Sequence, residues 1–279
     1  TAQNMAAMPV QFEKNVINFF PVTAAREMYE PFHRLKYSFA ATYFDQMKLA
    51  TPRLVKEKGA KKVCSMYQDD EFGLEVLRGA EEGLKGIGMQ MTEKTSFKRG
   101  ATDFSSQMQK LASAQCDFVV LGTIIRETIG GIATARKLGF NPTFLGSSAS
   151  YTDLIHKLGG PAMDGLYATH TAQQPYLDEA SQPIRFWATK YKTKFNEDPT
   201  VFSIYGYNAI NAFVKAAQKA GPNLSTDSFI KAMDSTTIPA DIFGSPEATF
   251  SATKRLGNDS SRLSQIQGQR WKVVSDYIK

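Results

Sequence analysis

From residue 61 to residue 146, segments with the apolar pattern of a strand alternate with segments that have the apolar spacing of a helix. Short apolar runs of strand type, KKVCSMY at 61–67 and CDFVVLG at 116–122, are each followed by a segment with apolar residues every three or four positions. The first such helical stripe includes Phe72, Val76 and Leu84, and glycines follow it. Strands alternating with helices predict parallel βαβ units whose helices flank the sheet. The pattern therefore predicts an α/β fold.

The same pattern extends outside this stretch. Strands or extended segments are expected at 15–20, 37–42, 89–95, 143–146 and 165–170, and strand-like runs lie around Phe250 and at 266–274. Helical stripes are expected around Met47, Met108 and Ile132, and in two longer helices that contain Trp187 and Phe213. Ser225 or Thr226 is a candidate cap of a short helix that ends near residue 233.

Small polar residues follow the apolar runs directly. Gln68, Thr123 and the pair Ser147-Ser148 each come immediately after a predicted strand. In open parallel sheets, ligands bind beyond the carboxyl ends of the strands. None of these side chains is a strong catalytic group, so the pattern favours a site that holds a small molecule by hydrogen bonds without chemical change.

Size and charge narrow the class of protein. The chain has 279 residues and 42% apolar composition, which suffices for two packed lobes or one large domain. Its net charge of +6 comes from dispersed basic residues, whereas nucleic-acid binders usually gather them on one face. No apolar run approaches the length of a membrane span, and residues 1–20 lack the charge and hydropathy pattern of a secretory signal. We expect a soluble chain that does not bind nucleic acid.

Cysteine and histidine usage gives no sign of a metal site or a cofactor. Cys64 lies inside one predicted strand and Cys116 at the start of another, and we predict buried free thiols, with a disulfide between neighbouring strands as the alternative. The three histidines form no HExxH pattern, and there is no CxxC. Phosphate loops of the GxGxxG and GxxxxGK[ST] types are also absent.

Three segments together resemble a known family: YQDDEFG after the first strand, PTVFSIYGYNAINAF at 199–213 and IPADIFGSPEATFSATKRLG at 238–257. The chain is similar over essentially its whole length to the periplasmic solute-binding proteins of ABC transporters. The matching branch is the type 1 group typified by leucine/isoleucine/valine-binding proteins. The order and spacing of the segments carry the resemblance, because no single motif is diagnostic.

The resemblance implies a two-lobed fold of the periplasmic-binding-protein type I. Each lobe would hold a parallel sheet flanked by helices, and three hinge crossings would join the lobes near 38–43, 169–172 and 256–262. Residues 1–43 and 171–257 would form lobe 1, and residues 44–170 and 258–279 would form lobe 2. In the family, the ligand is trapped in the cleft between the lobes.

The start of the chain departs from the family pattern. Family members begin with further βαβ units, whereas Thr1 falls well inside the pattern. We therefore expect lobe 1 to be incomplete at its N-terminus, and a reduced first lobe is the alternative. A strand at 15–20 without parallel neighbours would expose an apolar edge, which favours association between chains.

The resemblance also names ligand-binding candidates. In lobe 1, the turn at Thr23 and Ala24 would offer a hydroxyl and backbone donors to a ligand carboxylate, unless it is an ordinary turn. Phe202 and Tyr205 begin a helix that the family aims at the cleft, although Tyr205 also fits a core stripe. Phe72 stands where the family often places an aromatic residue over the ligand, or it belongs to the core.

The strand ends of lobe 2 supply the other candidates. Thr123 and Ile124 follow one strand, and Ser147 and Ser148 follow the next. The position of the two serines is supported both by the strand-end pattern and by the resemblance. Arg126 is a candidate counter-ion for an anionic ligand, although a surface arginine at a helix start is the usual case. The run 69–71 is acidic, which is typical of a solvated turn and helix-start charges rather than of a metal site.

One further departure concerns the ligand. Amino-acid-binding members place an acidic residue after the strand that corresponds to 143–146, where this chain has Ser147-Ser148-Ala149. A buried ammonium without a counter-charge costs several kcal/mol. We therefore predict a small organic acid without an ammonium group, with an aromatic carboxylate favoured. The alternative is that Asp69, Asp70 or Glu127 takes over the acidic role.

These features predict the extracytoplasmic solute-binding component of an ABC importer, located in the periplasm. Its partners would be a small-molecule ligand, either an organic acid or an amino acid, and the membrane permease of the transporter. The alternatives are a branched-chain or other amino-acid-binding protein, and a ligand-sensing regulator with the same fold. An α/β enzyme is disfavoured because the motifs that enzyme chemistry needs are absent.

Overall fold

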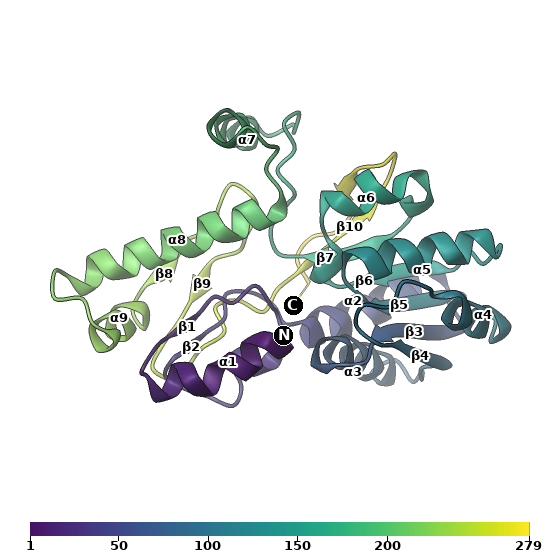
Figure 1. The fold of residues 1–279 in the computed structure, drawn as a ribbon, viewed down its shortest axis with the longest axis horizontal. Coiled ribbons are helices and arrows are strands. Elements are labelled where there is room, and N and C mark those ends of the chain that lie inside the picture. Colours follow the sequence, from purple (N-terminus) through teal and green to yellow (C-terminus); the bar gives the residue numbers. More distant parts are fainter. Residues whose placement is uncertain (279) are drawn as a thin grey trace. The chain divides into compact units, whose positions relative to one another are not determined.

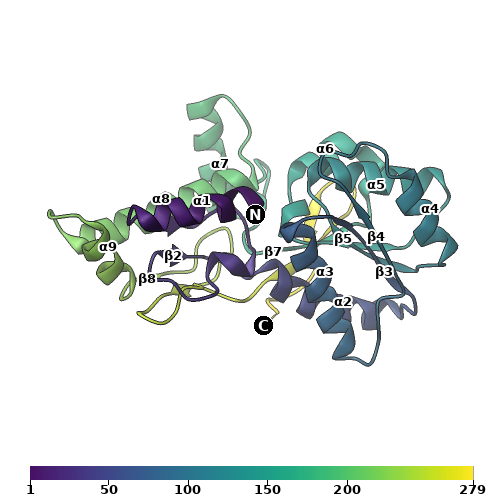
Figure 2. The same ribbon diagram turned by 60° about the horizontal axis from the view of Figure 1, so that its bottom comes forward.

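The computed structural model describes residues 1–278, and they form two compact units. Unit 1 comprises Gln3–Ala41 and Thr171–Asp259, and unit 2 comprises Thr42–His170 and the residues from 260 onward. Figure 1 labels the elements of both units, and Figure 2 shows the same ribbon turned about its horizontal axis. None of the helices within residues 1–278 is long and apolar enough to span a membrane.

Unit 2 contains the alternating pattern of the sequence. Its helices are α2 (Tyr43–Lys58), α3 (Glu71–Lys85), α4 (Ser105–Ser113), α5 (Ile125–Lys137) and α6 (Asp153–Gly159). Its strands are β3 (Val63–Gln68), β4 (Glu93–Phe97), β5 (Phe118–Gly122), β6 (Thr143–Gly146), β7 (Tyr167–His170), β10 (Arg262–Ile266) and β11 (Trp271–Val273). This mostly parallel sheet with flanking helices confirms the predicted α/β class.

The strands form one seven-stranded sheet with the order β11-β10-β7-β6-β5-β3-β4. The pairs from β4 to β7 are parallel, and β10 pairs antiparallel with both β7 and β11. Tyr67 of β3 pairs with Gly122 of β5, and Leu121 of β5 pairs with Gly146 of β6. The carboxyl ends of the three central strands therefore lie at the same level.

Helices cover both faces of this sheet (Figures 1 and 2). Asp70 begins α3, because its carboxylate accepts hydrogen bonds from the backbone N–H groups of Phe72 and Gly73 at 3.1 Å each. Glycine lets α3 approach α2 closely, since a Cβ atom on Gly79 would collide with the backbone of Phe44. The predicted stripe of α3 is confirmed, because Phe72, Val76 and Leu84 are buried.

The prediction of free thiols is wrong. Cys64 of β3 and Cys116, two residues before β5, form a disulfide with a Cα–Cα distance of 5.9 Å. The strands β3 and β5 are neighbours in the sheet, so their pairing brings the two cysteines together. The order of strands in the sheet decides this contact, and the sequence pattern alone does not fix that order.

Unit 1 is built mainly from helices. Its helices are α1 (Ala2–Glu13), α7 (Gln182–Phe195), α8 (Val201–Ala220) and α9 (Thr226–Met233), and its strands are β1 (Asn18–Phe19), β2 (Lys36–Tyr37), β8 (Thr237–Ile238) and β9 (Ala248–Thr249). Its core joins α8 and α9 to β2 and β9 through a cluster that includes Tyr37, Ala212, Phe229 and Phe250. Capping boxes begin α8 at Thr200 and α9 at Ser225, which confirms one of the two caps expected for α9.

Three strand predictions need correction. The strand expected at 15–20 is reduced to β1, because Asn15 and Phe20 have φ values of 55° and 48° and interrupt extended backbone on both sides. β1 also has a parallel neighbour, β2. The strand expected at 89–95 begins later, at Glu93. The run expected at 266–274 is interrupted, because Ile266 ends β10 and the return strand β11 of this antiparallel hairpin begins only at Trp271.

Candidate functional site

Hydroxyl side chains gather at the carboxyl edge of the parallel sheet in unit 2. Thr123 follows β5 and Ser147 follows β6, and both are fully buried. Thr123 Oγ1 lies 2.6 Å from Thr128 Oγ1, and Ser150 Oγ donates to the Thr123 carbonyl at 3.0 Å. Ser147 Oγ accepts from the backbone N–H of Ala149. These hydroxyls form hydrogen bonds with one another and with nearby backbone groups, and so they fix the local structure at this edge of the sheet.

Ser148 is the half-buried member of this edge. Its backbone N–H donates to Gln46 Oε1 at 2.9 Å, and Gln46 Nε2 donates to Ser148 Oγ at 3.0 Å. Thr169 Oγ1 donates to the same Gln46 oxygen at 2.8 Å. A buried glutamine of α2 therefore fixes the position of Ser148 and ties the end of β6 to β7.

Phe72 and Ile124 lie at the starts of the helices that follow β3 and β5. Phe72 is 5% exposed and packs edge-on against Tyr43 of α2, with ring centroids 5.0 Å apart. Ile124 is half-buried, and its carbonyl accepts from Thr128 Oγ1 at 2.6 Å. Phe72 thus has the core contact that its helical position allows, and Ile124 adds an apolar side chain near the hydroxyl edge.

The remaining candidates belong to unit 1. Thr23 is 9% exposed, and its Oγ1 lies 2.7 Å from Thr1 Oγ1. Ala24 is half-buried in the same turn, just before a short 3-10 helix at Arg26–Met28. The backbone N–H of Thr23 donates to the Pro21 carbonyl at 2.7 Å, so both the hydroxyl and the N–H of Thr23 have partners within unit 1, and a carboxylate-binding role for this turn stays a prediction.

Phe202 and Tyr205 occupy the first turns of α8. Phe202 is 43% exposed, and its ring centroid lies 6.0 Å from that of Tyr205. Tyr205 also lies 5.8 Å from the ring of Phe39 and lines a pocket of about 270 Å³ within unit 1. Tyr205 is therefore not a simple core residue, because part of its surface faces this pocket.

The three carboxylates that could replace the missing acidic residue differ in their burial and in their bonding partners. Asp70 caps α3, and Asp69 forms an ion pair with Lys98. Glu127, in the first turn of α5, is fully buried, and neither of its carboxylate oxygens has a hydrogen-bond partner among residues 1–278. Gln68 Oε1, at the end of β3, is likewise buried and unbonded within the described part of the chain.

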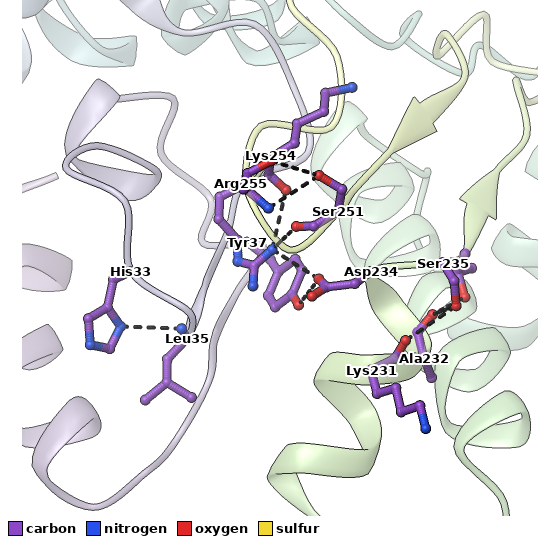
Figure 3. Close-up of polar contacts among 12 residues, drawn as sticks. His33, Leu35, Tyr37, Lys231, Ala232, Asp234, Ser235, Ser251, Lys254 and Arg255 are labelled. Atoms are coloured by element: carbon purple, nitrogen blue, oxygen red, sulfur yellow. Dashed lines mark hydrogen bonds and ion pairs between the residues drawn. The ribbon is translucent and has the colours of Figure 1, made fainter.

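A buried arginine organises a separate polar cluster in unit 1 (Figure 3). Arg255 Nη1 donates to Asp234 Oδ1 at 2.9 Å, and its guanidinium carbon lies 4.6 Å from the Tyr37 ring centroid. Tyr37 Oη donates to the same Asp234 oxygen at 2.7 Å. Burial raises the pKa of Tyr37 above its usual value, and the Asp234 hydrogen bond adds to the increase. Asp234 thus joins Arg255 and Tyr37, while Arg255 Nε has no hydrogen-bond partner among residues 1–278.

His170 is not an accessible catalytic group. His170 Nε2 lies 2.8 Å from Ser264 Oγ, which is the contact that a serine nucleophile and its base would make. Both residues are fully buried in the sheet, and His170 stacks on Tyr151. The described residues also contain no group of three or more metal-ligating side chains.

The structure thus groups some of the predicted residues and leaves others apart. Within unit 2, the ends of β5 and β6 bring Thr123, Ser147 and Ser148 to one edge of the sheet. Within unit 1, Phe202 and Tyr205 are adjacent on α8, whereas Thr23 and Ala24 lie in a separate turn. Gln46 was not predicted, and its one sequence signal is a polar residue next to Met47 on the buried face of α2.

Comparison with known proteins identifies relatives. The family model described as periplasmic binding protein matches residues 1–270. A Leu/Ile/Val-binding protein homolog from Brucella abortus is 22% identical over 233 residues, which cover 81% of this chain and 57% of that protein. The chain therefore spans less than two thirds of the length of this curated relative.

Solved structures share the fold. A branched chain amino acid ABC transporter protein from Thermus thermophilus, solved with bound valine, superimposes with a TM-score of 0.86 at 18% identity, covering 100% of this chain and 76% of that one. A fatty acid ABC transporter substrate-binding protein from Thermomonospora curvata gives a TM-score of 0.84 at 18% identity, covering 98% and 71%. The first of these proteins was solved with valine, and the second is named for fatty acid transport.

Proposed function

Because the chain belongs to the periplasmic binding protein family, we propose that it captures a small organic acid as the solute-binding component of an ABC importer. An aromatic carboxylate is the favoured ligand. The partner would be a membrane permease, and the protein would work outside the cytoplasm without catalysing a reaction. The Cys64–Cys116 disulfide supports an oxidising compartment such as the periplasm.

The observation that carries the choice of ligand is the neutral edge of the sheet in unit 2. Ser148 is half-buried there, held by the uncharged side chain of Gln46, and no carboxylate stands at positions 147–149. A serine can donate to or accept from a neutral group, but it cannot neutralise an ammonium. Burial of an ammonium at this edge would therefore lack its counter-charge.

Substitution of Ser148 tests this choice. Ser148→Glu would place a negative charge at the edge, and we expect it to weaken binding of cinnamate at least about tenfold, which corresponds to roughly 1.4 kcal/mol. Ser148→Ala should weaken binding less, because it adds no charge. Ser106→Glu, on the exposed first turn of α4, is the matched control. Equal cinnamate affinity in Ser148→Glu and Ser106→Glu would contradict the proposal.

An amino acid is the second candidate ligand, and Glu127 is the observation that favours it. Its buried carboxylate lacks a partner among the described residues, so it could supply the counter-charge that Ser147 and Ser148 do not. This candidate requires the carboxylate to become accessible, because Glu127 is 0% exposed. Glu127→Gln should then weaken leucine binding strongly and leave cinnamate binding unchanged.

A further inference from the structure

Unit 1 contains a pocket of its own, with a volume of about 270 Å³. One wall is α8, and another is formed by residues 238–248, the chain that runs from the end of β8 to the start of β9 beside α8 (Figure 1). The size is close to the lower end of pockets that hold small ligands, about 300 Å³. Every lining residue lies in unit 1, so none of the hydroxyl edge of unit 2 takes part.

Most of the lining is apolar. Phe20 and Phe39 have ring centroids 5.5 Å apart, and Phe39 lies 5.8 Å from the Tyr205 ring. Ala209 of α8 and Ile238 of β8 complete this surface. A ligand body that buries apolar area against such walls is stabilised by the hydrophobic effect. The pocket therefore suits a compact apolar or aromatic body.

Asp241 is the acidic residue of the lining, and both of its carboxylate oxygens already accept hydrogen bonds. Asp241 Oδ1 accepts the backbone N–H groups of Phe243 and Ser245, each at 2.9 Å, and Asn208 Nδ2 donates to Asp241 Oδ2 at 2.6 Å. Three neutral donors stabilise this carboxylate and hold the turn that closes the pocket. Asp241 therefore holds the pocket wall in place, and it gives no reason to expect a cationic ligand.

The basic group of the lining is free. Lys215 is exposed on α8, and its ammonium makes no hydrogen bond or ion pair with any residue in 1–278. The next lysine on the helix, Lys219, donates to the Ser235 carbonyl instead. Lys215 therefore offers the pocket a solvent-exposed positive charge, with which an anion can pair.

We propose that this pocket binds a small carboxylate with an apolar body, whose carboxylate pairs with Lys215 while the body packs against Phe39, Tyr205 and Ala209. This binding site stands apart from the transport role proposed above, because it needs neither the hydroxyl edge of unit 2 nor a permease. Tyr205 is the one candidate residue common to both.

Cinnamate and its neutral amide, cinnamamide, separate the contribution of charge from that of apolar contact. Lys215→Gln should weaken cinnamate binding at the pocket about tenfold and leave cinnamamide binding there unchanged, as measured by titration of the Ala209 methyl NMR signal. Lys231→Gln is the matched control, because Lys231 is an exposed lysine of unit 1 outside the pocket. Ala209→Leu should weaken both ligands more than tenfold by filling the pocket. Equal cinnamate affinity in Lys215→Gln and Lys231→Gln would overturn the proposal.

Alanine methyl NMR of the unsubstituted chain separates this site from the proposed ligand site. Cinnamate should shift the methyl signals of Ala209 and Ala248, which line the pocket, whatever happens at Ala149 beside Ser148. A shift at Ala149 alone would overturn the pocket proposal and support the proposed function. A shift at none of the three would overturn both.

Discussion

At the scale of single residues, Arg255 shows how unit 1 accommodates a buried charge. Its side chain is 2% exposed, and that of its ion-pair partner Asp234 is 18% exposed. The Tyr37 hydroxyl shares the Asp234 oxygen, and the guanidinium lies over the Tyr37 ring. Removing one partner of such a pair leaves the other charge without compensation, which costs more than the pair itself contributes.

Arg255→Gln should therefore destabilise unit 1 by about 3 kcal/mol, the lower end of values for broken buried pairs. Arg34→Gln is the control, because the Arg34–Asp227 pair is exposed, with 44% and 77% of the two side chains accessible. Exposed pairs contribute about 0–1 kcal/mol. Urea unfolding measures both variants, and an equal loss in the two would contradict the structural role of Arg255.

We expect two histidines, His156 and His33, to make the free energy of unfolding depend on pH. Burial lowers the pKa of His156 below its ordinary value of 6.5, and the nearby Asp153 carboxylate opposes this while Lys157 and Arg270 add to it. Burial also lowers the pKa of His33, with Lys36 and Arg34 adding to the decrease. In both cases the folded chain binds the proton less readily than the unfolded chain does.

The sign follows from linkage between protonation and folding. A lowered folded-state pKa contributes stability that is present above pH 6.5 and is lost as the pH falls through the folded-state pKa. We expect the free energy of unfolding, from urea titrations, to decrease between pH 7.5 and pH 5.5. The double variant His33→Gln/His156→Gln should show a flatter dependence, and an equally steep one would assign the effect to other groups.

At the scale of elements, the disulfide fixes two neighbouring strands. Cys64 lies in β3, and Cys116 stands just before β5, 52 residues later in the chain. A cross-link of this span removes about 4 kcal/mol of loop-closure entropy from the unfolded chain at 25 °C in the chain-entropy model. The disulfide therefore supports the centre of the sheet whose edge carries the serines.

The double variant Cys64→Ser/Cys116→Ser should lower the free energy of unfolding by up to about 4 kcal/mol. Reduction of the unsubstituted chain under denaturing conditions should have a similar effect, and the same reductant should leave the double variant unchanged. Guanidinium unfolding with and without reductant provides the measurement. Equal stability of the variant and the oxidised chain would refute a stabilising disulfide.

The elements of unit 2 could be predicted from the sequence because local pattern and burial agree there. The stripe through Phe72 and Val76 is both helical in period and buried in α3. The antiparallel pairing of β10 with β7 could not be predicted, because it joins residues about 95 positions apart, such as Arg262 with His170 and Gln265 with Tyr167. Gln46 was missed for the same reason, since its partner Ser148 is 102 residues away.

At the scale of the whole molecule, the family and the α/β class follow from the order of segments along the chain, and the family model and the sheet topology confirm both. The ligand depends on a few side chains at strand ends and helix starts. Two structural neighbours with nearly equal TM-scores are named for different ligands, valine and fatty acid. The fold alone therefore does not select the ligand, and charge at the site must do so.

Calorimetric titration of the unsubstituted protein with cinnamate, benzoate, leucine and valine tests the central claim most directly. We predict that an aromatic carboxylate binds more tightly than either amino acid, because the serine edge offers no counter-charge to an ammonium. Tight binding of leucine or valine together with no heat from cinnamate or benzoate would contradict the account.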